Sequence, residues 1–310
     1  MKSAIVTGAT GFIGKALVKR LLEEGIFVYG VDIEMSRFDE LKDCKNFLPV
    51  IAEFEDYKDL KERIGDRCVD VFYHLAWEGG FTTAMKDYKL QMKNAAYAGD
   101  ALVAAKNIGC RKFVYAGTYN EFEIRTFLET ESFEPRYTCI YATGKTAADL
   151  ICRTLAFNLG IEYNIAFIPM PYGEYNYSMQ LMNVVIDSLN RGIAPKLIVG
   201  ENPYDIVYIS DIVDGLMAIG ENGRDGRGYY IGHRKLRKFK DWIQDIRDVI
   251  APKVELRFGE YKDRQCIDYS KIDLNALYQD TGFECHADFE KSIKATAEWV
   301  KRNINTQDET

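Results

Sequence analysis

The sequence lacks long apolar runs and long runs of basic residues. No apolar stretch reaches the ~20 residues that a membrane-spanning helix needs, and glycines interrupt the short apolar run near the N-terminus. We therefore expect neither a signal peptide nor a membrane anchor. The net charge of −7 argues against nucleic acid as a partner, because a surface that binds it must neutralise many phosphates.

Closely spaced cysteines and histidines are also missing. The seven cysteines are scattered without a Cys-x-x-Cys spacing, which suits reduced thiols, and hence a cytoplasmic protein, better than a disulfide framework. His74, His233 and His286 make no metal-ligand spacing, so we expect no metal site.

Residues 1–168 alternate short apolar runs with longer helical patterns, which is typical of repeated strand-helix-strand units. We expect strands at 3–8, 27–32, 46–52, 69–76, 112–117 and 162–168, and helices from 12 to Gly25 and over about 84–108 and 141–159. The predicted fold class is α/β, a doubly wound parallel sheet that binds a cofactor. Residues 169–310, where the alternation stops, are expected to form mainly a smaller substrate-binding lobe, with some elements returning to the sheet. There we expect helices at 178–190, 209–220 and 288–301 and short strands at 228–232 and 255–259.

A glycine-rich turn, TGATGFIG, follows the first predicted strand. Gly8 permits a tight turn, Gly11 lets the backbone approach a pyrophosphate, and Gly14 lets the helix pack closely on the strand. The N–H groups at the helix start would hold the phosphates. Asp32, at the end of the second strand, suits the two hydroxyls of an adenosine ribose and would repel a 2′-phosphate, so NAD is favoured over NADP, a preference that Arg37 could soften.

The pair Tyr141 and Lys145 lies four residues apart on a predicted helix, so both side chains can point into one cleft. A nearby ammonium group favours the phenolate, which allows a tyrosine to take or give a hydroxyl proton while hydride moves to or from NAD. The spacing alone is more typical of a solvated helix face; the glycine turn and Asp32 before it favour the catalytic interpretation.

These motifs, in this order, resemble those of the extended short-chain dehydrogenases/reductases, the NAD-dependent epimerases, dehydratases and reductases of nucleotide sugars with a Rossmann-type fold. HLAW, residues 74–77, resembles the family segment that lies along the cofactor. Asn94 resembles the asparagine that organises the active-site helix. VYAGTYNEF resembles the segment with the catalytic Ser or Thr, and the register from Phe122 selects Thr118, 23 positions before Tyr141.

The resemblance assigns roles to further residues. Catalysis is assigned to Thr118, Tyr141 and Lys145. Cofactor binding is assigned to Gly8, Thr10, Gly11, Phe12, Ile13, Gly14, Asp32, Glu53, Phe54, Leu75, Ala76, Trp77, Asn94, Tyr141, Lys145, Ile168 and Met170. Substrate binding is assigned to Glu78, Thr118, Tyr119, Asn120, Tyr172, Tyr204, Arg234 and Arg264. It also implies a homodimer, formed through the helices that contain Asn94 and Tyr141.

Two positions depart from the family pattern. Met170 stands where an asparagine is usual, and Tyr204 stands where an arginine commonly holds the nucleotide diphosphate. Arg234, Arg237 and Arg264 are candidates for the missing charge. These departures concern the pose of the substrate, and the expectation of an NAD-binding fold does not depend on them.

Several reactions stay open. Dehydration is disfavoured, because Tyr119 and Asn120 replace the Asp-Glu pair of family dehydratases and Glu121 comes one residue late. An epimerase, which would oxidise and reduce a nucleoside-diphosphate sugar at a carbon such as C4, suits a bound NAD that is regenerated in each turnover. A 4-keto-sugar reductase is favoured by the HLAW and GTYNEF segments. A reductase of non-sugar carbonyls and a non-catalytic NAD-binding regulator are the remaining alternatives.

Overall fold

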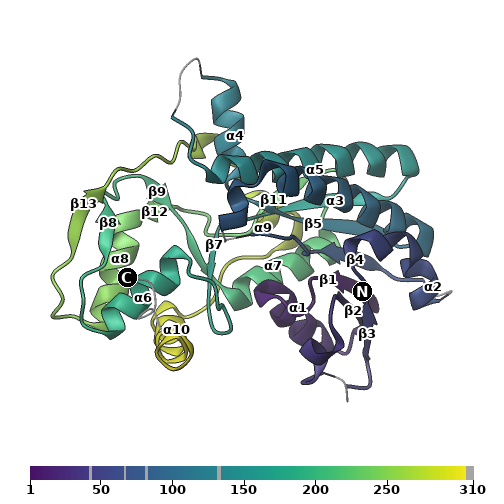
Figure 1. Ribbon diagram of the computed structural model, residues 1–310, viewed down its shortest axis with the longest axis horizontal. Coiled ribbons are helices and arrows are strands. Elements are labelled where there is room, and N and C mark those ends of the chain that lie inside the picture. The colour runs from purple at the N-terminus through teal and green to yellow at the C-terminus, as the bar shows by residue number, and fades with distance from the viewer. Residues whose placement is uncertain (42–43, 66–67, 81–82, 131–133, 305–310) are drawn as a thin grey trace.

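The computed structural model describes residues 1–41, 44–65, 68–80, 83–130 and 134–304 (Figure 1). Its main sheet has seven strands in the order β11-β6-β5-β4-β1-β2-β3. All neighbouring strands in this sheet are parallel. The strands are β1 (Ser3–Thr7), β2 (Phe27–Asp32), β3 (Phe47–Ile51), β4 (Val71–His74), β5 (Lys112–Thr118), β6 (Glu162–Ile168) and β11 (Gly228–Tyr230). The predicted α/β fold with a parallel sheet is confirmed.

Helices cover both faces of the sheet, which explains why its strands are apolar on both sides. On one face, the long helices α3 (Tyr88–Ile108) and α5 (Thr138–Leu159) lie side by side, with the short α2 (Leu60–Ile64) and α4 (Glu121–Leu128) at their ends (Figure 1). On the other face lie α1 (Phe12–Glu23), α7 (Ile209–Asn222) and α9 (Ala276–Thr281). The two faces have separate apolar cores.

A smaller lobe, on the left of Figure 1, has a third apolar core between α6 (Leu181–Asn190), α8 (Phe239–Ile250) and α10 (Phe289–Asn303). Its strands pair two by two: β7 (Met170–Tyr172) with β10 (Ile206–Tyr208), β9 (Pro203–Tyr204) with β12 (Arg237–Lys238), and β8 (Lys196–Ile198) with β13 (Arg257–Tyr261). Although they follow residue 168 in the chain, β11 joins the main sheet beside β6 and α7 packs on α1. The two lobes therefore share elements.

Most element boundaries lie close to the predicted ones. The helix expected from about 84 begins at Tyr88, after a 3-10 turn over Thr83–Lys86, and the helix expected from 141 begins earlier, at Thr138. Further 3-10 turns span Met35–Phe38, Phe54–Asp59 and Tyr269–Lys271. The helix α4 was not predicted: it begins three residues after β5 ends, and its apolar positions are too few to show a clear period.

Candidate active site

The glycine turn between β1 and α1 has no room for side chains. Gly8 has a φ of +66°, and a Cβ there would lie 3.0 Å from the backbone of Ala76. A Cβ on Gly14 would lie 2.0 Å from the carbonyl oxygen of Gly8. The turn therefore brings the start of α1 against the sheet with its first N–H groups uncovered, which is the geometry that holds a pyrophosphate.

Two cavities meet at this turn and run along the carboxyl ends of the strands. We call them the Asp32 cavity, of about 580 Å³, and the Tyr141 cavity, of about 500 Å³. They share Gly8, Thr10, Gly11, Leu75 and Trp77 in their walls. An elongated dinucleotide fits such a pair of cavities, with its pyrophosphate at the shared turn.

The Asp32 cavity has the features of an adenosine site. One carboxylate oxygen of Asp32 accepts hydrogen bonds from the backbone N–H and the hydroxyl of Thr10, at 3.0 and 2.7 Å. Phe54 forms part of the wall and stacks on Tyr97 with ring centroids 4.6 Å apart. Arg37, also in the wall, forms an ion pair with Glu34 at 3.4 Å. Other predicted cofactor residues in this wall are Glu53 and Ala76.

The Tyr141 cavity collects most of the other predicted residues. Its wall contains Thr118, Tyr119 and Asn120 at the end of β5, Ile168 at the end of β6 and Met170 at the start of β7. It also contains Tyr141 and Lys145 from α5 and Phe12, Ile13 and Gly14 from the start of α1. Because these segments come from the carboxyl ends of adjacent parallel strands, they converge on one edge of the sheet. A parallel sheet thus brings residues 118, 141 and 145 beside the glycine turn.

Tyr141 is buried on the first turns of α5, and its hydroxyl hydrogen-bonds that of Thr118. Burial raises the pKa of Tyr141 above its ordinary value, and the Thr118 hydroxyl works in the opposite direction by stabilising the phenolate. The pair is therefore set to share a proton, but the phenolate needs a positive charge nearby to form at neutral pH.

Lys145 is the cation beside Tyr141, with its ammonium nitrogen 6.0 Å from the centroid of the Tyr141 ring. Its ammonium group donates a hydrogen bond of 2.9 Å to the carbonyl oxygen of Ala116 and lies 3.9 Å from the centroid of the Trp77 ring. Burial lowers the pKa of Lys145, and the carboxyl group of Glu121 raises it again. Trp77 also meets Tyr141 edge to face, with ring centroids 6.0 Å apart, so one indole contacts both members of the pair.

Asn94 holds the loop after β4 in place through two hydrogen bonds. Its amide group donates to the carbonyl oxygen of Glu78 at 2.8 Å and accepts from the Glu78 N–H at 3.2 Å, which fixes the loop after β4. Asn94 itself is outside the described walls of both cavities, whereas Glu78, a predicted substrate residue, lines the Asp32 cavity. Asn94 is therefore placed to position the loop that carries Trp77.

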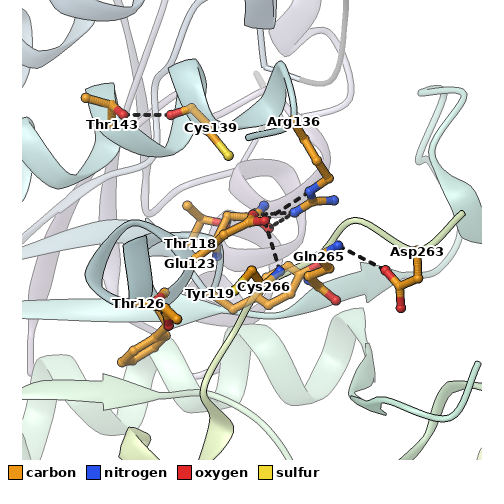
Figure 2. Close-up of polar contacts among 12 residues, drawn as sticks. Thr118, Tyr119, Glu123, Thr126, Arg136, Cys139, Thr143, Asp263, Gln265 and Cys266 are labelled. Atoms are coloured by element: carbon orange, nitrogen blue, oxygen red, sulfur yellow. Dashed lines mark hydrogen bonds and ion pairs between the residues drawn. The ribbon is translucent and has the colours of Figure 1, made fainter. Parts of the chain in front are cut away.

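Two predicted substrate residues are buried away from the cavities. Tyr204 lies in β9, and its hydroxyl is 3.3 Å from that of Tyr119, which separates it from the Tyr141 cavity (Figure 2 shows Tyr119). The Tyr172 hydroxyl is 2.6 Å from that of Ser292, inside the smaller lobe. Tyr204 thus connects the two lobes, whereas the contact of Tyr172 lies within the smaller lobe. Contact of either side chain with a substrate stays a prediction.

The two arginines predicted to bind substrate are also outside the described cavity walls. Arg234 donates to Asn275 at 2.9 Å and lies over the ring of Tyr278, 4.0 Å from its centroid, so α9 holds it. Arg264 is exposed. In the structure as described, neither provides the charge that the family arginine would supply, and their assignment stays a prediction.

The Tyr141 cavity is also lined by residues that the sequence did not indicate. Lys15 lines it from α1. Asn176 and Gln180 line it from the loop before α6, and the Nδ2 atom of Asn176 and the Oε1 atom of Gln180 are buried with no hydrogen-bond partner among the described residues. Unpaired buried polar atoms are costly, so Asn176 and Gln180 are candidates to hydrogen-bond a polar ligand in this cavity. No local signal in the sequence marks them, because their burial depends on the packing of the two lobes.

The side chains in the walls of the Tyr141 cavity limit the reactions that this site can catalyse. The described residues of the Tyr141 cavity include no aspartate or glutamate, and their cationic side chains are Lys15 and Lys145. No set of three or more potential metal ligands occurs in the part of the chain that the structure describes. Its described helices include none that is both long and apolar enough to cross a membrane. The arrangement offers a tyrosine for proton transfer beside a dinucleotide site.

Residues 4–232 match the model of the NAD dependent epimerase/dehydratase family. The chain is 24% identical over 320 residues to the UDP-glucuronate 4-epimerase of Thermodesulfobacterium geofontis, covering 97% of this chain and 96% of that protein. It is 25% identical over 315 residues to a dTDP-glucose 4,6-dehydratase of Streptomyces griseus, covering 96% and 94%.

The fold is also similar to solved structures. A crystal structure of UDP-glucuronic acid 4-epimerase from Bacillus cereus, in complex with UDP-glucuronic acid and NAD, matches with a TM-score of 0.76 and 19% identity, covering 97% of this chain and 99% of that one. At this identity the likeness shows a shared fold.

Proposed function

Because the chain belongs to the NAD-dependent epimerase/dehydratase family, we propose that it moves hydride at a carbinol or keto carbon of a nucleoside-diphosphate sugar. NAD, the cofactor of the family, fits the glycine turn and the Asp32 cavity. The observation that carries the proposal is the meeting of Thr118, Tyr141 and Lys145 in one cavity that continues into the Asp32 cavity. C4 is the first candidate carbon, since relatives with the same fold are 4-epimerases.

Thr118, Tyr141 and Lys145 have separate roles in this reaction. NAD, when bound, would accept the hydride from the carbinol carbon or return it to the ketone. Tyr141 takes the hydroxyl proton in the oxidising direction and gives it back in the reducing one. Thr118 orients the sugar hydroxyl, and the Lys145 ammonium stabilises the phenolate and binds the hydroxyls of the nicotinamide ribose.

The cavity favours redox chemistry over elimination of water. Dehydration needs a carboxyl group at the sugar, and the described walls of the Tyr141 cavity contain none. Glu121, the nearest candidate in sequence, has a carboxyl oxygen 2.8 Å from the N–H of Thr118 and is buried behind the wall. Epimerisation with a regenerated NAD and reduction of a keto sugar are the two reactions that remain.

The test has two steps. A thermal-shift panel with UDP, GDP, CDP and dTDP, each with NAD present, identifies the nucleotide, since a ligand that binds the native state raises stability by mass action. The matching nucleotide sugars are then assayed for epimerised product and for net NADH consumption, which separate the epimerase from the reductase. Full turnover in Tyr141→Phe would refute the assigned chemistry. NADH binding with no reaction on any nucleotide sugar would favour the regulator, and reaction with simple ketones alone would favour the non-sugar reductase.

We also propose that the protein works as a homodimer in the cytoplasm. Large apolar side chains are exposed on α3 and α5, among them Met92, Leu150 and Phe157, whose exposed fractions are 49%, 59% and 89%. A second copy that packed its own α3 and α5 there would bury them. The seven cysteines are free thiols, in keeping with a reducing compartment. Phe157→Glu should shift the mass measured by light scattering from dimer to monomer.

A further inference from the structure

Glu121 is the first residue of α4, directly behind the wall of the Tyr141 cavity. Its side chain is fully buried, and its Oε1 atom accepts a hydrogen bond of 2.8 Å from the N–H of Thr118. Its Oε2 atom is buried without a hydrogen-bond partner among the described residues. A Cβ on Gly117 would lie 2.6 Å from Oε1, so the carboxyl group fills the space that a side chain at residue 117 would take.

This placement differs from that of an ordinary helix-capping acid. A carboxylate in the first turn of a helix is usually exposed and contributes a fraction of a kcal/mol through the helix dipole. A buried carboxylate with an unpaired oxygen loses several kcal/mol of hydration, and a nearby positive charge must offset that loss. The carboxyl group of Glu121 therefore depends on the positive charges of the groups around it.

The titratable groups around Glu121 come from three elements. Lys145, Asp149 and the phenol of Tyr141 face it from α5, Arg125 from α4, and the phenol of Tyr115 from β5. Burial raises the pKa of Glu121 and Asp149 adds to this, whereas the Thr118 N–H and the Lys145 ammonium lower it. Arg125 is exposed for 43% of its side chain, and its nearer contact is Asp149, so Lys145 is the buried cation of the set.

Lys145 has its own ring of neighbours. It faces the imidazole of His74 from β4, the thiol of Cys152 on α5, and the rings of Tyr115, Tyr141 and Trp77. Burial is the main influence that lowers the pKa of Lys145, and Glu121 is the first of the groups that raise it. His74 is buried and uncharged, because burial and Lys145 together lower its pKa to about 3.

We propose that Glu121 is a positioning residue of the site: its carboxyl group anchors the Thr118 main chain, so that the Thr118 hydroxyl faces Tyr141, and its negative charge favours the protonated form of Lys145. Glu121 touches neither cofactor nor substrate in this assignment. It acts through Thr118 on one side and through Lys145 on the other. The inference rests on the proposed function only in taking Tyr141 and Lys145 as the acid/base pair.

The variant Glu121→Gln separates charge from anchoring, because the amide oxygen can still accept the Thr118 N–H. Glu123→Gln is the matched control: Glu123 is a second fully buried glutamate of the same helical turn, but it pairs with Arg136 and accepts the N–H of Cys266 at 3.2 Å (Figure 2). The primary measurement is the dissociation constant of NADH between pH 6 and 10 by fluorescence, which needs no sugar substrate. Lys145→Met identifies which step of that profile belongs to Lys145.

In the wild type, NADH binding should weaken as pH rises through the loss of the Lys145 proton. In Glu121→Gln this midpoint should fall by about 1 pH unit or more, because the negative charge that raises the pKa of Lys145 is removed. Glu123→Gln should keep the wild-type midpoint, and Glu121→Gln should add no further shift to Lys145→Met. Glu121→Met, which also removes the acceptor for Thr118, should lower kcat at the pH optimum below that of Glu121→Gln.

Other outcomes overturn the inference. An unshifted midpoint in Glu121→Gln, or equal shifts in both glutamine variants, would show that the charge of Glu121 does not act on Lys145. Equal kcat values for Glu121→Met and Glu121→Gln at the pH optimum would remove the anchoring role. A wild type that turns over no nucleotide sugar, but whose NADH midpoint shifts with Glu121→Gln, would refute the proposed function and leave the charge coupling standing.

Discussion

The ammonium group of Lys145 lies 3.9 Å from the centroid of the Trp77 ring, and both residues line the Tyr141 cavity. An ammonium over an indole in a buried site gains about 2 kcal/mol. Trp77→Leu should therefore lower the pKa of Lys145 and reduce kcat/KM at pH 7 by about 10-fold or more. Activity should partly recover at a pH high enough for Tyr141 to ionise without the positive charge of Lys145. The measurement is the pH profile of kcat/KM for Trp77→Leu.

Trp77→Phe is the control for this prediction. Both variants remove the hydrogen bond of 2.8 Å from the indole N–H to the Oε1 atom of Gln91, but phenylalanine keeps an aromatic face for the ammonium. We expect Trp77→Phe to retain most of kcat/KM. If the two variants lost activity equally, the hydrogen bond to Gln91 or the shape of the loop would account for the effect.

The sequence alone was sufficient to predict those parts of the site that depend on a few neighbouring residues. The turn itself needs Gly8, Gly11 and Gly14, and Asp32 ends a buried apolar strand. The glycine turn and the acidic residue can therefore both be recognised from a few neighbouring residues. The strands of the main sheet were predictable for the same reason: runs buried on both faces are almost continuously apolar.

What the sequence could not predict depends on contacts between distant segments. Tyr204 and Tyr119 are 85 positions apart, and only packing reveals that their hydroxyls meet at 3.3 Å. Arg234 was predicted as a candidate for the missing charge because its contact with the ring of Tyr278, 44 positions away, is not apparent from the sequence. The unpaired Nδ2 atom of Asn176 also cannot be predicted from the sequence, because its burial depends on the packing of the two lobes.

His74 makes the stability of the protein depend on pH. Burial, with Lys145 nearby, lowers its pKa to about 3, whereas a histidine in an unfolded chain has a pKa near 6.5. Between these values the unfolded state binds one proton more than the native state, so the free energy of unfolding falls as pH falls, by up to about 1.4 kcal/mol per pH unit from this residue. Above pH 6.5 the contribution is constant.

The variant His74→Asn should lack that dependence while keeping a partner for the hydroxyl of Thr7, which lies 2.9 Å from Nδ1 of His74. It is expected to be less stable than the wild type at pH 7.5, because it leaves space among buried rings. The difference between the two proteins, measured by urea unfolding at pH 7.5, 6 and 5, should shrink as the pH falls. Differences that stay equal at all three pH values would contradict the prediction.

Asp32 should control the choice between NAD and NADP. Its carboxylate would repel a 2′-phosphate, whereas Arg37 and Lys93 in the wall of the same cavity would attract one. Asp32→Ser should therefore reduce the preference for NADH over NADPH by about 10-fold or more, measured as the ratio of their dissociation constants. Glu62→Gln, on an exposed helical position outside the described cavity wall, makes the same change of net charge and should leave the ratio unaltered. A ratio that changed equally in both variants would point to net charge alone.

Asn176 is expected to bind the substrate through its unpaired amide. Asn176 lines the Tyr141 cavity; its Oδ1 atom accepts the N–H of Ser178 at 3.2 Å, whereas its buried Nδ2 atom has no partner among the described residues. Asn176→Asp keeps the acceptor and exchanges the donor for a negatively charged oxygen, which repels a diphosphate and cannot donate to a sugar hydroxyl. The KM for the nucleotide sugar should rise by about 10-fold or more, because a lost hydrogen bond and an unpaired charge each cost over 1 kcal/mol. Ser178→Ala, which disturbs the loop but retains Nδ2, should change KM much less. An equal loss of NADH affinity in Asn176→Asp would show instead that the loop supports the cofactor.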